Sequence, residues 1–544
     1  MAVSATSVLV VGAGPTGLAA ANVLGRLGVE TIVVERDRSV ASEPRAVSID
    51  DEAMRLLQSL GLAANAAPAV RPGTGTRYYS AAGRLLAAAA TPTPPPFGHP
   101  LKNPIDHGAF TRLLLDGLAE QPSVAVRLGC ELVGLDAAGN QAEALVRAAD
   151  GSEDDIEARW VLGCDGGRSA TRKLLGIEMA GRSLEEPWLV IDTCDDPHDE
   201  RYAMHHGDPA RPHVVLPYGD GRCRYEFLLL PGEDEATATS FAMAQRLLAA
   251  HRPDLRPEHV LRQRVYVFHA LLATTWRRGR AFLLGDAAHM MPPFAGQGLN
   301  SGLKDAANLA WKLAAVVRGE LDERALDSYE QERRRHAALM IDLSVRRGRE
   351  VMTTSRTRAR MRDTAALLAR RLPPLRRRLD TLPVKPPARH DQGLIVRGGA
   401  AIAGAMLPQP RVLLADGRLA LLDDVLGPSF ALLAVEPTEG ALRASVWVSL
   451  GARRVRIQLD ERFPPSTGPH EAPIVADADG LLRDALADCR GLVVVVRPDR
   501  FVLGAFGPAK EQDFLDQWRR LGGPVTDGRA AGDGRVPAPL RSTT

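Results

Sequence analysis

Residues 8–17 of the chain read VLVVGAGPTG, and residues 29–35 read VETIVVE after an alanine- and leucine-rich segment. An apolar run that ends in Gly-x-Gly-x-x-Gly, a helical segment and a second β-branched run that ends in an acid are typical of a dinucleotide-binding βαβ unit. Gly12 allows the tight strand-to-helix turn, Gly14 lets a pyrophosphate approach the backbone, and Gly17 lets the helix pack closely on the strands. The unpaired N–H groups at the start of the helix then face the phosphates.

Glu35, the acid that ends the second run, indicates which ribose the unit prefers. Its carboxylate can accept hydrogen bonds from both hydroxyls of an adenosine ribose and would repel a 2′-phosphate. NAD and FAD share this fingerprint, so the motif by itself leaves both open. Its place at the start of the sequence favours FAD, because many flavoproteins begin in this way.

The composition favours an α/β enzyme of several domains, about two to four by length. The 68 basic and 66 acidic side chains nearly balance, which gives no reason to expect a nucleic-acid partner. The five cysteines are scattered without a Cys-x-x-Cys pair, so we expect neither a disulfide framework nor a metal site. We expect a cytoplasmic protein with no membrane association, because no basic leader segment and no apolar run of spanning length is present.

Two further acidic turns follow apolar runs. Asp165-Gly166 comes after residues 160–164, and Gly285-Asp286 comes after residues 281–284. An acid at the carboxyl end of a strand can meet a ligand in the crevice at that edge of the sheet. A helix predicted from about Leu299 can stabilise an anion at its positive end, and a reduced flavin carries such a charge.

The three motifs in this order, with the last two flanking a β-rich insertion, resemble the class A flavoprotein aromatic hydroxylases, which are FAD-dependent monooxygenases. The resemblance covers roughly residues 6–350 and is most specific from Gly285-Asp286-Ala287-Ala288-His289 to Gly298-Leu299-Asn300. It implies an α/β fold: a Rossmann-like FAD-binding domain of the glutathione-reductase type, interrupted by a β-rich substrate domain. The C-terminal part resembles the thioredoxin-like α/β domain of the phenol hydroxylase branch, without the Cys-x-x-Cys of a dithiol redox site.

These observations predict a division of the chain into six segments. They are residues 1–180, the first part of the FAD-binding domain with an inserted β-meander; 181–275, the β-rich substrate domain; 276–380, the second part of the FAD-binding domain with long helices; 381–395, a linker; 396–525, the thioredoxin-like domain; and 526–544, a flexible tail.

The sequence also predicts individual elements. Residues 71–100 read as hairpin-like strands, and residues 124–135 and 142–148 read as strands of the meander. Near the C-terminus, residues 445–450 read as a strand and residues 480–489 as a helix.

The resemblance implies the chemistry as well. FAD would be the bound cofactor, and NAD(P)H, with NADH favoured, would be a transient co-substrate without a fold of its own. O₂ would add at flavin C4a, and the hydroperoxide would transfer OH to an electron-rich ring. The expected substrate is a small phenolic acid such as 3-(3-hydroxyphenyl)propionate, hydroxylated ortho to give a catechol. The same branch raises a homodimer as the oligomeric state.

The predicted cofactor site combines the three motifs with neighbouring loops. By the resemblance, Asp286 would bind the ribityl chain, the backbone of 298–300 would face the isoalloxazine, and Arg45 would lie beside the flavin. Where many relatives carry a Gln, this chain has His107, which can donate one hydrogen bond but cannot copy both amide contacts. The full set is Gly12, Gly14, Pro15, Thr16, Gly17, Glu35, Arg36, Arg45, His107, Asp165, Gly285, Asp286, Pro293, Gly296, Gly298, Leu299 and Asn300.

The predicted catalytic residues are Arg45, His206 and Tyr225. A phenolate is a better nucleophile than a phenol, so we expect a base or proton relay near the phenol oxygen. The β-rich segment offers other candidates for this relay and for binding a substrate carboxylate. They are His205, His213 and Tyr218 for the relay, and Arg211 or Arg224 for the carboxylate.

Three other functions remain to be weighed on the sequence. A polyketide or antibiotic-tailoring hydroxylase would share the architecture, and its pocket residues would decide the substrate. An NAD-dependent dehydrogenase belongs to a different class and is disfavoured, because Gly285-Asp286 suits a ribityl chain and no catalytic Tyr-x-x-x-Lys or zinc set is evident. A non-catalytic flavin-binding protein would leave the three cofactor motifs without a use.

Overall fold

The computed structural model describes residues 3–40, 43, 45–383, 385–438, 442, 444–459 and 472–525. The tail predicted over residues 526–544 lies outside these ranges. Among the helices of the described ranges, none combines the length and apolar character that a membrane crossing requires.

The N-terminal βαβ unit forms as predicted. Strands β1 (Val3–Val11) and β2 (Thr31–Glu35) pair in parallel, and helix α1 (Pro15–Arg26) connects them. Gly12 has a φ of 104°, and a Cβ there would lie 2.6 Å from the carbonyl oxygen of Cys164. A Cβ at Gly17 would lie 2.0 Å from the carbonyl oxygen of Gly12, so both positions require glycine.

The first sheet has the order β18-β19-β10-β1-β2-β7, and β9 and β8 extend from β10. The strands from β19 to β7 are parallel. One prediction was wrong here: residues 124–128 form β7, a parallel edge strand beside β2, and only β8 to β10 make the antiparallel meander. The partner of β7 lies far away in sequence, so local pattern could not assign it. The remaining bounds are β7 (Val124–Leu128), β8 (Cys130–Asp136), β9 (Ala142–Ala148), β10 (Glu153–Gly163), β18 (Arg277–Arg278) and β19 (Ala281–Leu283).

Helices pack along this sheet and carry its loops. Helices α3 and α7 pack on α1, and α2 packs on α7. Short strands β3 and β6 pair with each other, and β11, β17 and β20 form a separate small sheet. The bounds are α2 (Asp51–Ser59), α3 (His107–Asp116), α4 (Ala170–Leu174), α7 (Gly298–Val317), β3 (Ser48–Asp50), β6 (Lys102–Pro104), β11 (Met179–Ser183), β17 (His269–Ala273), β20 (His289–Met290), and the 3₁₀ turns η1 (Ala63–Asn65), η2 (Pro257–His259), η3 (Gly285–Ala287) and η4 (Pro293–Ala295).

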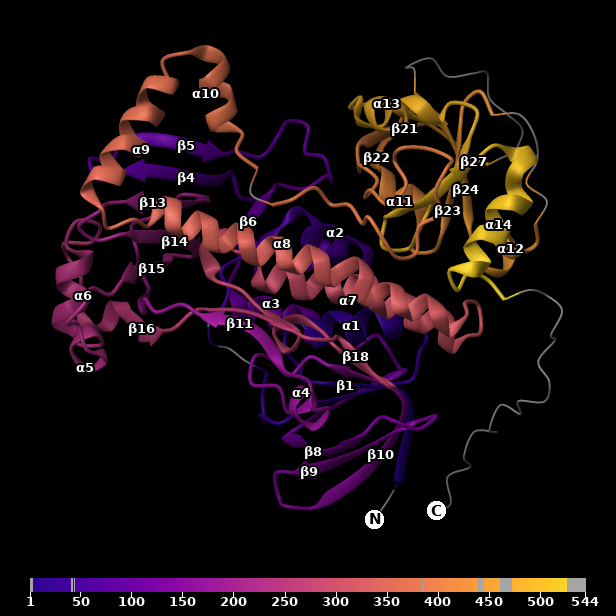
Figure 1. The fold of residues 1–544 in the computed structure, drawn as a ribbon, viewed down its shortest axis with the longest axis horizontal. Coiled ribbons are helices and arrows are strands. Elements are labelled where there is room, and N and C mark those ends of the chain that lie inside the picture. The colour runs from indigo at the N-terminus through magenta and orange to yellow at the C-terminus, as the bar shows by residue number, and fades with distance from the viewer. Residues whose placement is uncertain are drawn as a thin grey trace.

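The second sheet has the order β16-β12-β15-β14-β13-β4-β5. Its strands from β16 to β13 are antiparallel, as predicted for this β-rich segment. Strands β4 and β5 were expected within the first part of the FAD-binding domain, but β4 pairs in parallel with β13 and extends the second sheet. Helices α5 and α6 cover the face of the sheet that carries Leu189 and Tyr225 (Figure 1). The bounds are β4 (Gly75–Ser80), β5 (Leu85–Ala89), β12 (Trp188–Thr193), β13 (Tyr202–Gly207), β14 (His213–Gly219), β15 (Arg222–Leu228), β16 (Val260–Tyr266), α5 (Glu235–Ala238) and α6 (Phe241–Leu248).

Long helices lead to a third sheet with the order β22-β21-β25-β24-β23-β26-β27, which lies at the opposite end of the view in Figure 1 from the second sheet. Residues 446–449 form helix α12 instead of the predicted strand. The alternating run reads as a strand, but the indole of Trp447 is buried and donates to Glu511 at 2.6 Å, a tertiary contact that the local pattern does not contain. The bounds are η5 (Glu323–Asp327), α8 (Ser328–Val351), α9 (Arg356–Ala369), α10 (Pro373–Asp380), β21 (Arg411–Leu414), β22 (Leu419–Leu421), α11 (Leu422–Leu426), β23 (Ala431–Val435), α12 (Val446–Ser449), β24 (Arg453–Gln458), β25 (Ile474–Asp477), α13 (Leu481–Ala485), η6 (Ala487–Cys489), β26 (Val493–Val496), β27 (Val502–Phe506), η7 (Pro508–Lys510) and α14 (Glu511–Arg520).

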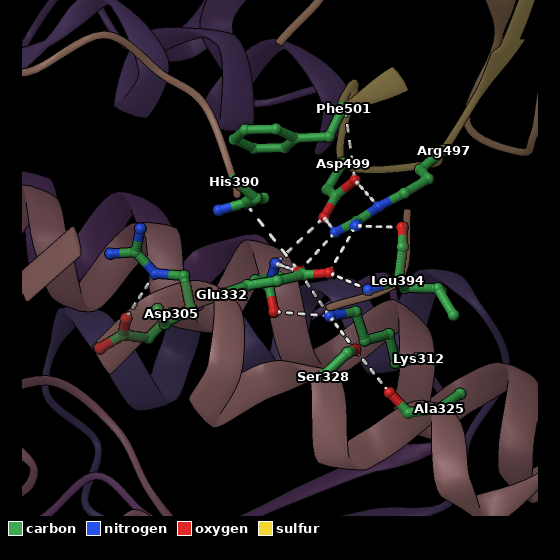
Figure 2. Close-up of polar contacts among 12 residues, drawn as sticks. Asp305, Lys312, Ala325, Ser328, Glu332, His390, Leu394, Arg497, Asp499 and Phe501 are labelled. Carbon is green, nitrogen blue, oxygen red and sulfur yellow. Dashed lines mark hydrogen bonds and ion pairs between the residues drawn. The ribbon is translucent and has the colours of Figure 1, made fainter. Parts of the chain in front are cut away.

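A buried carboxylate joins the third sheet to the long helices, as Figure 2 shows. Glu332 on α8 accepts hydrogen bonds from both terminal nitrogens of Arg497, at 2.7 and 2.8 Å, and from the Lys312 Nζ at 2.8 Å. Burial by itself would raise the pKa of Glu332, but the charges of Arg497 and Lys312 outweigh it and hold the pKa well below its usual value. Glu332 is therefore ionised and fully paired at neutral pH.

We expect Glu332→Gln to lower the free energy of unfolding by about 3–5 kcal/mol, because it leaves Lys312 buried without its paired carboxylate and Arg497 with Asp499 as its remaining partner. A urea titration followed by tryptophan fluorescence measures this. Glu350→Gln is the matched control, since Glu350 is an exposed glutamate on the same helix and should change the value by less than about 0.5 kcal/mol. Equal urea midpoints for the two variants would contradict the role given to Glu332.

Candidate active site

A cleft of about 610 Å³ opens where the carboxyl ends of the first sheet face the second sheet. One wall comes from the turns after β1, β2 and β10 and from the segment 291–299. The other wall comes from β13, β14 and β15. This is the position at which open α/β sheets bind ligands.

Most of the residues predicted to bind a cofactor line this cleft, although they come from separate parts of the chain. Those that line it are Gly12, Gly14, Pro15, Thr16, Glu35, Arg36, Arg45, His107, Asp165, Asp286, Pro293, Gly296, Gly298 and Leu299.

Gly17, Gly285 and Asn300 are not lining residues but shape the cleft from behind. A Cβ at Gly285, where φ is 59°, would lie 2.8 Å from the Thr16 hydroxyl. The Asn300 amide nitrogen donates to the carbonyl of Gly296 at 2.8 Å, and its oxygen accepts from the backbone N–H of Asp50, also at 2.8 Å. These contacts fix the turn between η4 and α7.

The end of the cleft formed by β1 and β2 fits the adenosine and pyrophosphate of a dinucleotide. Glu35 is held by two backbone donors, Ala13 N–H at 2.8 Å and Asp37 N–H at 3.1 Å. A Cβ at Gly14 would meet no atom within 4 Å, so the backbone at the start of α1 is open to the cleft. The carboxylate for the ribose and the free amides for the phosphates are thus both in place.

Asp165 organises its own turn. It accepts from the Ser169 hydroxyl at 2.5 Å and from the Thr171 backbone and hydroxyl at 2.9 and 3.0 Å. These donors engage both carboxylate oxygens of Asp165. The side chain therefore stabilises the start of α4 at the edge of the cleft.

A buried network that the sequence analysis missed supports the Gly285-Asp286 turn. The Asp305 carboxylate accepts from the backbone N–H of Gly285 at 3.0 Å and contacts His289 Nε2 at 2.7 Å. Its second oxygen accepts from Arg333 Nε at 2.9 Å. The side chain of His289 therefore points away from the cleft and holds the turn that presents Asp286.

The second-sheet wall combines polar and apolar side chains. Burial lowers the pKa of Lys102 to about 8 and that of His205 to about 3, and it raises the pKa of Glu226. Lys102 and Glu226 were not predicted. The strand alternation could have found Glu226, because it lies two residues after Arg224 and so on the same face of β15. The apolar lining residues of this wall and the adjoining loop are Val214, Leu216, Met291 and Phe294.

Two of the three predicted catalytic residues do not reach the cleft. His206 and Tyr225 lie next in sequence to His205 and Arg224, so the pleat turns them to the opposite face of the sheet. Tyr225 donates to the Asp196 carboxylate at 3.1 Å, and the His206 ring stacks on His213. The assignment of both as catalytic groups was wrong, because the sequence does not show which face of the sheet meets the cofactor edge.

Of the other candidates in the β-rich segment, some line the cleft and others do not. Arg211 pairs with Glu233 at 2.7 Å away from the cleft, and His213 and Tyr218 are not lining residues. Arg224 does line it, but its guanidinium forms two bonds with Asp192, at 2.8 and 3.0 Å.

Arg45 and His107 both line the cleft, and they lie close enough for the charge of Arg45 to act on the imidazole. The carbonyl of Arg45 accepts from Arg224 at 2.9 Å. Burial and the positive charges of Arg45 and Arg224 lower the pKa of His107 to about 4. His107 is therefore neutral at pH 7 and offers one donor and one acceptor.

Comparison with known proteins agrees with this geometry. A family model described as FAD binding domain matches residues 5–344, and one described as HcaD C-terminal domain matches residues 404–521. A 3-(3-hydroxy-phenyl)propionate/3-hydroxycinnamic acid hydroxylase from Burkholderia cenocepacia (strain HI2424) is 39% identical over 91% of this chain and 93% of that protein. The enzyme of the same name from Escherichia coli O8 (strain IAI1) is 36% identical over 91% of each chain.

Solved structures share the whole fold at lower identity. The flavin-dependent monooxygenase PieE, in complex with FAD and substrate, has a TM-score of 0.78 and 21% identity, covering 95% of this chain and 99% of PieE. Aklavinone-11 hydroxylase with FAD and aklavinone also has a TM-score of 0.78, with 23% identity, covering 96% of this chain and all of that one.

The chain therefore belongs to the class A FAD-dependent aromatic hydroxylases. It is an FAD-dependent monooxygenase, and the cleft has the groups that the cofactor needs at its adenosine end.

We expect Glu35→Ala to weaken FAD binding by roughly 10- to 100-fold, because it removes hydrogen bonds to a charged acceptor. Titration of flavin-free protein with FAD, followed by quenching of flavin fluorescence, measures the dissociation constant. Glu30→Ala, at an exposed glutamate just before β2, is the control and should bind FAD like the unaltered protein. Unchanged affinity in Glu35→Ala would remove Glu35 from the cofactor site.

Proposed function

We propose that this enzyme consumes NADH and O₂ to hydroxylate 3-(3-hydroxyphenyl)propionate, or a similar phenolic acid, ortho to the phenol oxygen, giving a catechol. The relatives that bear this activity in their names support the substrate class. The observation that carries the proposal is one continuous cleft, which joins the dinucleotide edge of the first sheet to a wall of mixed polar and apolar side chains.

FAD, when bound, takes electrons from NADH and delivers one oxygen atom of O₂ to the ring. The chain's own part is to orient the ring and exclude water. Phe294 serves this purpose, because it is buried between Trp188 and Phe268, with ring centroids 5.2 and 5.8 Å away. Val214 and Leu216 belong to the same apolar cluster as Phe294 and line the cleft with it.

Lys102 is proposed to bind the carboxylate of the substrate. The two arginines considered for this role are committed elsewhere, Arg211 to Glu233 and Arg224 to Asp192. A methyl group placed on Gly296 would lie 3.5 Å from the Lys102 Nζ, so this ammonium sits between the predicted flavin-facing loop and the second sheet. With a pKa of about 8, it is charged at neutral pH.

Glu226 and His205 are proposed to receive the phenol proton in place of His206 and Tyr225. Both line the cleft, and burial raises the pKa of Glu226, which brings that carboxylate closer to the range of a useful base. His205 is neutral, since burial lowers its pKa to about 3, and can pass a proton between its two nitrogens.

The C-terminal sheet is proposed to be thioredoxin-like and to serve in a homodimer rather than in catalysis. Parallel strands β23, β24 and β25, followed by the antiparallel β26 and β27, support the fold assignment. The cleft receives no lining residue from this part of the described chain. The antibiotic-tailoring alternative is not favoured, because its structural relatives stand below 25% identity and share the fold alone.

We expect 3-(3-hydroxyphenyl)propionate to stimulate NADH oxidation by the FAD-loaded protein and to be converted to a catechol. Oxidation is followed by NADH absorbance, and the product is identified by chromatography with mass detection. Stimulation with hydrogen peroxide as the sole product would contradict this substrate, while absence of any flavin-dependent NADH oxidation would contradict the reaction itself.

We expect Lys102→Met to raise KM for 3-(3-hydroxyphenyl)propionate by roughly 10- to 100-fold at pH 7 and to leave KM for the uncharged 3-ethylphenol nearly unchanged. Because the folded pKa of Lys102 is depressed to about 8, its charge is lost as pH rises through 8. KM for the acid should therefore rise above pH 8 in the unaltered enzyme and lose this dependence in Lys102→Met.

Lys102→Arg keeps the charge and is the matched control, with KM for the acid close to that of the unaltered enzyme. Equal increases in KM for the acid and for 3-ethylphenol in Lys102→Met would show that Lys102 maintains the cleft without binding the anion.

A further inference from the structure

Four histidines gather on the face of the second sheet that points away from the cleft. His206 on β13 and His213 on β14 are directly opposite each other in the antiparallel pairing, and His251 follows α6, which covers this face. His198 comes from the loop between β12 and β13. Sequence spacing gives no hint of this cluster, since the four residues come from separate elements.

The ring nitrogens converge. One nitrogen from each of His206, His213 and His251 lies within 4.8 Å of the other two. The Nε2 atoms of His213 and His251 are 3.0 Å apart. Two nitrogens bound to one tetrahedral Zn²⁺ at 2.0–2.1 Å are about 3.4 Å apart, so small side-chain rotations bring these atoms to coordinating positions.

The protonation pattern also suits coordination. His213 Nδ1 lies 2.9 Å from the carbonyl of Arg211, which can only accept, so this nitrogen carries the proton and leaves Nε2 with its lone pair.

The outer contacts resemble those of metal-binding histidines, in which the second ring N–H donates a hydrogen bond to a carbonyl or carboxylate. Besides the Arg211 carbonyl behind His213, the Glu200 carboxylate lies 2.9 Å from His198 Nδ1. The Nε2 atoms of His198 and His206 are both buried and have no hydrogen-bond partner among the described residues. A buried polar nitrogen without a partner is costly, and a metal ion would satisfy it.

We propose that His206, His213 and His251 form a binding site for a divalent transition-metal ion, with Zn²⁺ as the ion that best fits, and that His198 completes its coordination. All-nitrogen imidazole sites suit Zn²⁺, Cu²⁺ and Ni²⁺, and a near-tetrahedral arrangement favours Zn²⁺. The ion joins β13, β14 and the end of α6. It lies behind the wall that carries His205, Val214 and Leu216 into the cleft, so it braces the substrate wall without touching substrate.

The test uses FAD-loaded protein without an affinity tag, treated with a chelator and then titrated with Zn²⁺ in a calorimeter. We expect one Zn²⁺ per chain. Co²⁺ should give absorption bands of a tetrahedral ion at wavelengths beyond the flavin bands, and Zn²⁺ should abolish them. Saturating Zn²⁺ should raise the unfolding temperature, because the ion binds the folded chain.

His251→Gln and His206→Gln remove one ligand each and should each weaken Zn²⁺ binding by at least about 100-fold, with loss of the Co²⁺ bands. His269→Gln is the matched control, since His269 lies on β17 outside the cluster and contacts Ser183. The flavin spectrum of each variant verifies that it is folded. Absence of stoichiometric binding, or equal binding by His251→Gln and His269→Gln, would show a purely hydrogen-bonded histidine cluster and overturn the proposal.

Discussion

The site depends on one constraint, the close approach of the Gly12 and Cys164 backbones at the end of the first sheet. Gly12 lies so near the carbonyl of Cys164 that no side chain fits between them, and Gly17 packs equally closely on Gly12. These contacts hold the carboxyl ends of β1 and β10 at the same edge of the sheet as the carboxyl end of β2. The turns that carry Glu35, Asp165 and Asp286 therefore open at one edge, although they are far apart in sequence.

The second sheet depends on a different constraint, the alternation of side chains across its pleat. One face of the sheet lines the cleft and carries His205, Arg224 and Glu226, near Lys102. The opposite face, which α6 covers, carries His206 and Tyr225. Residues adjacent in sequence therefore lie in different environments. One faces the cleft and the next faces the histidine cluster. A register shift of one residue would exchange the two sets.

The same two constraints explain what the sequence could predict. The βαβ unit and the Gly285-Asp286 turn follow from local pattern, whereas Arg45, His107 and the 298–300 backbone were assigned to the cofactor by the family resemblance. Interactions between distant segments could not be read in this way. They include the pairing of β4 with β13, the parallel edge strand at 124–128, the Asp305 network and the burial of Trp447 that makes 446–449 helical. The choice of His206 over His205 failed for the same reason, because only the packed structure shows which face of β13 meets the cofactor edge.

We propose that flavin and phenol meet between the 296–298 loop and the face of β13–β15 that carries Glu226. A crystal structure of the FAD-loaded enzyme soaked with 3-(3-hydroxyphenyl)propionate tests it most directly. We predict the phenol ring against the apolar surface of Phe294 and Leu216, with the carboxylate of the substrate at Lys102 and the isoalloxazine along Gly296–Gly298. A ring bound on the His206 face, or against the C-terminal sheet, would contradict the account.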